Sequence, residues 1–105
     1  MKDLVGFFNA VDLSSENKEA VQQILSRLDQ EVVSKWVSGI EAKDGKITGT
    51  FYTDIGAVLP FNQFIALYTA LGYDPITIQW WRDYRCGHGG CLYNPGYTCN
   101  PNSCT

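Results

Sequence analysis

Residues 40–52 read IEAKDGKITGTFY, a strand-turn-strand pattern in the middle of a chain of 105 residues. The turn is Asp44-Gly45, and a two-residue hairpin turn needs residues that tolerate positive φ at both positions. From Ile47 to Tyr52, apolar or small residues alternate with hydroxyl-bearing residues, which is typical of a strand with one buried face. The stretch therefore predicts one β-hairpin. The fold class then depends on whether the segments before and after it are helices or strands.

Before the hairpin, apolar residues recur at helical spacing. Leu4 and Phe8 belong to a first group of such residues and predict a short helix. Ser14 offers an N-cap oxygen to a second group, which continues to Val37. This second group predicts one long helix that ends at Gly39.

After the hairpin, the same periodicity predicts two more helices. Pro60 suits the first position of a helix, where no intrahelical hydrogen bond needs its missing N–H, and the apolar pattern continues until Gly72. Asp74-Pro75 is another pair typical of a helix start. Apolar and aromatic residues follow at four-residue spacing, so the pattern predicts a final helix that reaches Arg85.

Residues 71–81, LGYDPITIQWW, resemble the turn and second helix of helix-turn-helix proteins. The resemblance implies a second helix that would face the major groove of DNA with four uncharged residues, Ile76, Thr77, Gln79 and Trp80. The chain has a formal net charge of −3. Phosphate contacts need basic side chains, so we expect a structural helix pair and no nucleic-acid partner.

Composition indicates one small domain with a distinct C-terminal segment. The chain is 45% hydrophobic, but no run reaches the roughly 18 apolar residues of a membrane span. We expect residues 1–85 to form a mostly α domain of the α+β class, with one hairpin and a helix-turn-helix-like pair. We expect residues 86–105 to form an irregular cysteine-rich tail. No signal sequence is recognisable, which favours a cytoplasmic chain, with a mature secreted protein as the alternative.

The tail contains all four cysteines, Cys86, Cys91, Cys99 and Cys104, and no Lys, Arg, Asp or Glu. Four cysteines in a small chain are typical of two disulfides, and three pairings are possible. Such disulfides persist mainly in secreted proteins. The first interpretation of the tail is therefore a disulfide-stapled segment.

Zinc is a second interpretation of the same residues. His88 lies between the first two cysteines, so the tail offers five possible ligands, namely Cys86, His88, Cys91, Cys99 and Cys104. Each cysteine pair has four intervening residues, which is the upper limit of the spacing in structural zinc sites. A zinc-binding interaction module remains open as an alternative.

A third interpretation comes from Gly89-Gly90, which immediately precedes Cys91. A double glycine between an acidic helical region and a short Cys-rich segment resembles bacterial precursors of ribosomally made, enzymatically modified peptides, including bacteriocin-like ones. Residues 4–8 and 71–74 are similar to the two ends of the nitrogen-fixation-associated leader family. The resemblance implies that a folded leader recruits modifying enzymes and an exporter, and that a protease cuts between Gly90 and Cys91.

No catalytic motif is recognisable, since there is one histidine, no G-x-S-x-G and no phosphate-binding glycine loop. We expect a protein that is not an enzyme and needs no cofactor, except zinc in the second interpretation. Trp80 and Trp81 would point about 100° apart on a helix, so both cannot face one small core. With Tyr84 they are candidates for a protein-binding surface. The sequence thus favours a modified-peptide precursor, with a disulfide-stapled binding or self-assembling protein and a zinc module as alternatives.

Overall fold

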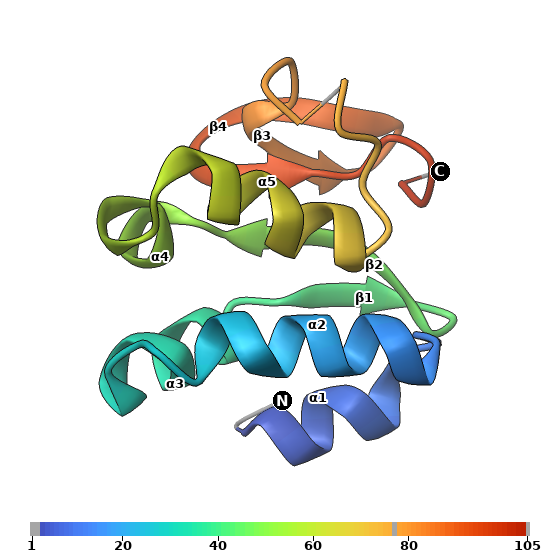
Figure 1. The fold of residues 1–105 in the computed structure, drawn as a ribbon. Helices are drawn as coiled ribbons and strands as arrows, with labels where there is room; N and C mark the ends of the chain where they lie inside the picture. The colour runs from blue at the N-terminus through green and yellow to red at the C-terminus, as the bar shows by residue number, and fades with distance from the viewer. Residues whose placement is uncertain (1–2, 77, 105) are drawn as a thin grey trace.

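The computed structural model describes residues 3–76 and 78–104. Within these residues it contains five helices and four strands (Figure 1), which confirms the α+β class. In chain order they are α1 (Leu4–Ala10), α2 (Ser15–Leu25), α3 (Gln30–Ser38), β1 (Glu41–Lys43), β2 (Lys46–Phe51), α4 (Thr53–Val58), α5 (Phe61–Ala70), β3 (Arg82–Gly87) and β4 (Gly90–Cys99).

Side-chain caps explain where the first helices begin. The Asp3 carboxylate accepts a hydrogen bond from the Gly6 N–H at 2.7 Å and starts α1. The Ser14 hydroxyl accepts one from the Asn17 N–H at 3.1 Å and starts α2, as predicted. The prediction of a single long helix is wrong, because a new helix, α3, begins after Asp29. The Asp29 carboxylate caps it by accepting a hydrogen bond from the Glu31 N–H. Apolar spacing continues through the break, and for that reason periodicity alone did not reveal it.

The predicted hairpin is confirmed at its turn. Asp44 and Gly45 have φ values of 54° and 80°, and the strands on either side pair antiparallel with Lys43 opposite Lys46. The expectation of one buried face on the second strand is wrong, since the four residues from Ile47 to Thr50 are all buried. Alternation in the sequence also did not reveal that β2 has a strand partner on its second edge.

That partner is β4, and the sheet order is β1-β2-β4-β3. Gly49 lies opposite Cys99 and Thr50 opposite Thr98 in the antiparallel β2–β4 pair. A Cβ on Gly49 would lie 2.6 Å from the Thr98 carbonyl oxygen, so the close approach of β4 requires glycine here. Most of the tail is therefore a strand, which corrects the prediction that it is irregular.

The predicted helix over residues 74–85 is also wrong. Residues 75–76 and 78–81 form turns, residues 82–85 belong to β3, and Thr77 lies outside the described residues. Asp74 does begin one turn, since its carboxylate accepts from the Ile76 N–H at 2.9 Å and its carbonyl accepts from the Ile78 N–H at 3.2 Å. The second helix of a helix-turn-helix is thus reduced to a single turn, and β3 crosses the expected boundary at Arg85.

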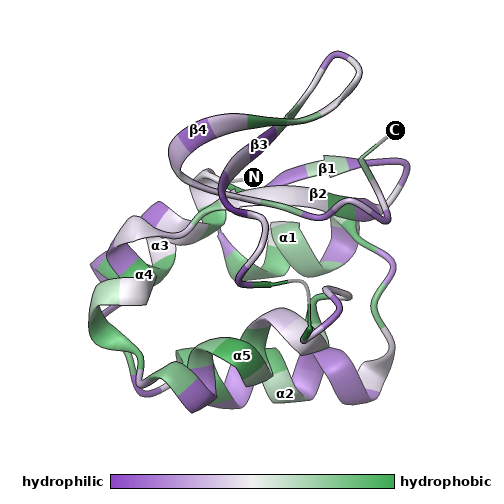
Figure 2. Cartoon of the chain, turned by 90° about the horizontal axis from the view of Figure 1, so that it is seen from above, coloured by the Kyte–Doolittle hydropathy of each residue, from purple (hydrophilic) through white to green (hydrophobic). Residues whose placement is uncertain are grey.

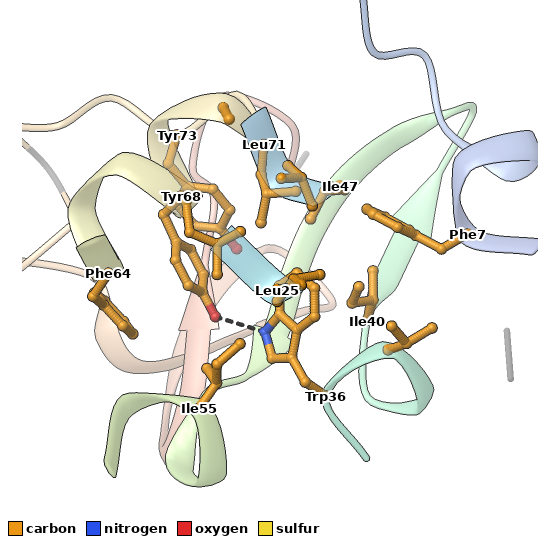
Figure 3. Packing of buried hydrophobic residues seen from close by; sticks show 14 of the residues in the cluster. Phe7, Leu25, Trp36, Ile40, Ile47, Ile55, Phe64, Tyr68, Leu71 and Tyr73 are labelled. Atoms are coloured by element: carbon orange, nitrogen blue, oxygen red, sulfur yellow. Dashed lines mark hydrogen bonds between the residues drawn. The ribbon is translucent and has the colours of Figure 1, made fainter. Parts of the chain in front are cut away.

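The hydrophobic core lies among the helices and the inner strands (Figure 3). It is rich in large side chains that are at most 4% exposed, among them Phe7, Leu25, Trp36, Phe64 and Tyr68. In Figure 2 the four strands gather on one side of the molecule, α2 and α5 lie on the other, and the β3–β4 hairpin projects from the body. Within the described ranges, no helix has the length and apolar character needed to cross a membrane.

Candidate functional site

The tail folds as a hairpin that carries two disulfides. In the β3–β4 pair, Cys86 lies directly opposite Cys91, yet these two are not bonded to each other. Cys86 is bonded to Cys104 and Cys91 is bonded to Cys99, with Cα–Cα distances of 5.6 and 5.9 Å. The predicted disulfide residues are thus confirmed, and the pairing is nested, with the shorter loop inside the longer one.

The inner disulfide requires β4 to bend, because it joins two residues of the same strand. The β3–β4 register shifts between Arg82 and Tyr84. At the bend, the Asp83 carboxylate accepts hydrogen bonds from the Gly96 N–H at 3.0 Å and the Tyr52 hydroxyl at 2.7 Å. These two bonds lower the pKa of Asp83, the Gly96 bond most strongly. Asp83 therefore fastens the bent strand to the body.

Three cysteine sulfurs lie close together and the fourth is bonded to one of them, and we call the four sulfurs the sulfur cluster. The sulfurs of Cys91, Cys99 and Cys104 lie within 4.8 Å of one another, and the sulfur of Cys86 is bonded to that of Cys104. Cys99 is 0% exposed and Cys104 is 6% exposed. His88 is exposed in the turn between β3 and β4 and is not part of this group. Of the five proposed zinc ligands, the fold brings together the four cysteines.

The double glycine lies at the tip of the hairpin. Gly89 and Gly90 have φ values of 93° and 128°, and Gly90 pairs with Gly87 at the end of the ladder. Such φ values are strained for residues with a Cβ, which explains both glycines by the turn alone. A protease cutting after Gly90 would act at the start of β4, a strand that pairs with both β3 and β2.

Four aromatic side chains lie on the β3–β4 hairpin and the loop before it, and we call them the aromatic surface: Trp80, Trp81, Tyr84 and Tyr93. Trp80 is 74% and Tyr93 is 72% exposed, whereas Trp81 and Tyr84 are half-buried. Three of the rings form a row, with centroids 5.3 Å apart between Trp81 and Tyr84 and 5.9 Å apart between Tyr84 and Tyr93. The sequence identified the first three residues. Tyr93 was missed because only the Tyr84–Tyr93 strand pairing brings it there.

A charged contact also joins the hairpin to β1. Arg85 donates to the Glu41 carboxylate through Nε at 3.1 Å and Nη2 at 2.8 Å. Its guanidinium also lies 4.5 Å from the centre of the Tyr97 ring. The hydrogen bond to Glu41 raises the pKa of Arg85. A surface hollow beside this pair reaches Leu92 and Tyr93, so the hairpin presents both an aromatic face and an adjoining recess.

A buried hydroxyl network ties the hairpin to the core, and it consists of Trp36, Thr50, Tyr68, Tyr73 and Thr98. The Trp36 indole N–H donates to the Tyr68 hydroxyl at 3.0 Å (Figure 3), and the Tyr68 hydroxyl is also hydrogen-bonded to the hydroxyl of Thr50. Thr50 then donates to Thr98 at 2.8 Å. Tyr73 also donates to Thr98, at 3.0 Å, and Thr98 donates to the Thr50 carbonyl at 3.4 Å. Because the Thr98 hydroxyl donates to the Thr50 carbonyl, it accepts from Thr50 and Tyr73, and Thr50 in turn accepts from Tyr68. The network therefore ends on the Thr50 carbonyl.

Alkaline pH is expected to destabilise the protein through this network. Burial raises the pKa of Tyr68 to about 12 and raises that of Tyr73 as well. In the unfolded chain tyrosine ionises near pH ~10, so the folded state holds protons that the unfolded state loses. We expect the free energy of unfolding to fall by about 1.4 kcal/mol per pH unit for each buried tyrosine between pH ~10 and ~12. Urea unfolding at a series of pH values measures the slope, and an unchanged slope in Tyr68→Phe would contradict it.

No family model, no curated protein and no solved structure matches this chain.

Proposed function

We propose that this chain is a non-catalytic binding domain that recognises another protein through the aromatic surface of its disulfide-stapled hairpin. The observation that carries the proposal is the exposure of Trp80 and Tyr93, at 74% and 72%. Exposed aromatic rings with polar atoms are enriched at protein interfaces, because each buries a large apolar area and still makes hydrogen bonds. The two disulfides hold this surface rigid before binding, which reduces the entropy lost on association.

The edge of the sheet indicates the form of the partner. β3 is the terminal strand in the order β1-β2-β4-β3, so one side of its backbone has no strand partner among the described residues. An extended segment of another protein can add to such an edge through main-chain hydrogen bonds. The aromatic surface beside Tyr84 would then contact the side chains of that segment. We therefore propose an extended, largely apolar segment as the ligand.

Site-specific photocrosslinking tests this proposal even though the partner is unidentified. A photoreactive phenylalanine derivative replaces Trp80 or Tyr93 in the full chain, expressed in its native source. We expect both positions to give the same discrete adduct with another protein. Val58 and Phe61 are matched controls, because they are exposed at 50% and 53% and lie on α4 and α5.

Three outcomes would contradict the proposal. The control positions could give the same adduct as the hairpin positions, which would indicate nonspecific contact. The hairpin positions could give no adduct at all. Adducts formed only with a second copy of the chain would replace the proposed partner with self-association.

The modified-peptide precursor stays a prediction, and the covalent connections are our reason for ranking it second. A cut between Gly90 and Cys91 would leave residues 91–105 attached to the body by the Cys86–Cys104 disulfide. The same residues include most of β4, which pairs with β2. Release of a product would therefore require both reduction and separation of the strands. The intact mass of the native protein distinguishes the two functions, since the binding domain should retain residues 91–105 and lack only the hydrogens lost in forming two disulfides.

The disulfides also bear on location. Disulfides persist in oxidising compartments and are rare in a reducing cytosol. We therefore propose a secreted or otherwise extracytoplasmic protein in place of the cytoplasmic precursor. Fractionation of the native source, with intact mass measured in each fraction, tests this placement.

A further inference from the structure

The sulfur cluster has a geometry that neither disulfide requires. A disulfide needs only its own two sulfurs to meet, yet here the sulfurs of Cys91, Cys99 and Cys104 lie within 4.8 Å of one another. Cys86 joins them through its bond to Cys104. The four residues come from β3, from both ends of β4 and from the segment after β4. Convergence of four thiol positions from separate segments is the arrangement of a tetrathiolate metal site.

Size and donor chemistry both fit zinc. In a tetrahedral site the Zn–S distance is about 2.3 Å, which places the four sulfurs about 3.8 Å apart. The sulfurs of Cys91, Cys99 and Cys104 therefore need to move by little once the S–S bonds are opened, and the Cys86 sulfur has to separate from that of Cys104 to the same spacing. The tail contributes no carboxylate side chain, so hard cations such as Ca²⁺ and Mg²⁺ find no such oxygen ligands in it, whereas four thiolates favour a softer ion.

We propose that the reduced protein binds one Zn²⁺ through Cys86, Cys91, Cys99 and Cys104. Each disulfide takes two electrons and two protons from one equivalent of a dithiol reductant, and that reductant is itself oxidised to a disulfide. Opening both disulfides therefore consumes two equivalents. The four resulting thiols then lose their protons to solvent as Zn²⁺ binds four thiolates. Zinc and the two disulfides are thus alternative cross-links of the same four residues.

The surroundings hold the ligands in place when the S–S bonds are absent. Cys99 lies opposite Gly49 in the β2–β4 pair, next to Thr98 of the hydroxyl network. The Cys104 N–H donates to the Asn100 carbonyl at 2.9 Å. Asn100 is buried, and its side-chain amide donates to the Ile47 carbonyl at 3.3 Å. These contacts do not involve sulfur, so reduction leaves them available.

Cobalt and zinc titrations of the full chain test the proposal. The protein is reduced anaerobically with a phosphine, which opens disulfides without supplying a thiol ligand, and is titrated with Co²⁺ and then Zn²⁺. We expect one metal per chain, the visible and charge-transfer absorption of tetrahedral thiolate-bound Co²⁺, and its displacement by Zn²⁺ with sub-nanomolar affinity. The near-ultraviolet circular dichroism of the buried aromatic residues should match that of the oxidised protein.

Two variants separate the site from nonspecific thiol binding. Cys86→Ser should weaken zinc binding roughly 100-fold or more, because one ligand is lost. His88→Ala should bind zinc as the unaltered chain does. The proposal is overturned if no zinc binds, if one zinc joins two chains, if His88→Ala weakens binding, or if metal binds while the near-ultraviolet signal is that of an unfolded chain.

Discussion

Reduction of both disulfides, with a chelator present to exclude metal, is expected to lower the free energy of unfolding by roughly 5 kcal/mol. The bonds close loops with sequence separations of 18 for Cys86–Cys104 and 8 for Cys91–Cys99. Loop-closure entropy assigns about 3 kcal/mol to the first and about 2.5 kcal/mol to the second, and nesting makes the total slightly smaller than the sum. A domain of this size has a total stability of about 5 to 15 kcal/mol, so the reduced chain is expected to be marginal.

Urea unfolding of the oxidised and reduced protein measures this loss, and paired variants divide it. Cys91→Ser with Cys99→Ser should remove the contribution of the inner loop, and Cys86→Ser with Cys104→Ser that of the outer loop. His88→Ala is the matched control. His88 lies between Cys86 and Cys91 and its side chain is exposed, so the substitution should leave the free energy of unfolding unchanged. A loss below about 1 kcal/mol on full reduction would show that the hairpin is held by its other contacts.

Thr98→Val is expected to destabilise the protein by roughly 3 to 5 kcal/mol, although the two side chains have nearly the same shape. The hydroxyl of Thr98 donates to the Thr50 carbonyl and so accepts from the hydroxyls of Thr50 and Tyr73, and all three residues are at most 4% exposed. Valine would leave both donors buried without an acceptor, and each unpaired buried donor costs about 1 to 3 kcal/mol. Urea unfolding of the oxidised variant measures the change.

Tyr73→Phe is the control for Thr98→Val, because it removes a donor to Thr98 and leaves the acceptor in place. Tyr73→Phe removes only one donor to Thr98, which still accepts from Thr50, so we expect a loss of about 1 kcal/mol. Adding Tyr73→Phe to Thr98→Val should restore about 1 to 2 kcal/mol, because it removes one of the two unpaired hydroxyls. If the two changes simply added, the assigned direction of donation would be wrong.

The sequence was sufficient to predict those elements whose turn or cap residues lie within or next to the element itself. Asp44-Gly45 specifies the first hairpin because both residues accept positive φ. Ser14 specifies the start of α2 because its side chain satisfies a backbone N–H of the first turn. α4 was missed, since it has six residues and no side-chain cap.

Elements that depend on distant partners were not predictable in this way. Trp80 and Tyr84 are spaced as on a helix, but Tyr84 lies opposite Tyr93 in the β3–β4 pair. The strand pairing therefore places Tyr84 in a strand and not in a helix. Pro95 and Gly96 are unfavourable in an ordinary strand, yet β4 includes both at its bend. The candidate site was predicted only in part for the same reason. The four cysteines and three aromatic residues are visible in the sequence, whereas their pairing and the position of Tyr93 depend on the fold.

The place of β4 in the sheet has a consequence for synthesis of the protein. β4 is the last strand in the chain, but it lies between β2 and β3. While the ribosome is still making residues 90–99, β2 can pair only with β1, and Thr50 has no Thr98 to bond. The nascent chain therefore exposes an unpaired edge until these residues emerge, and such edges are prone to aggregate. We expect complete folding to occur after this segment leaves the ribosome, with a late step that inserts one strand between two others.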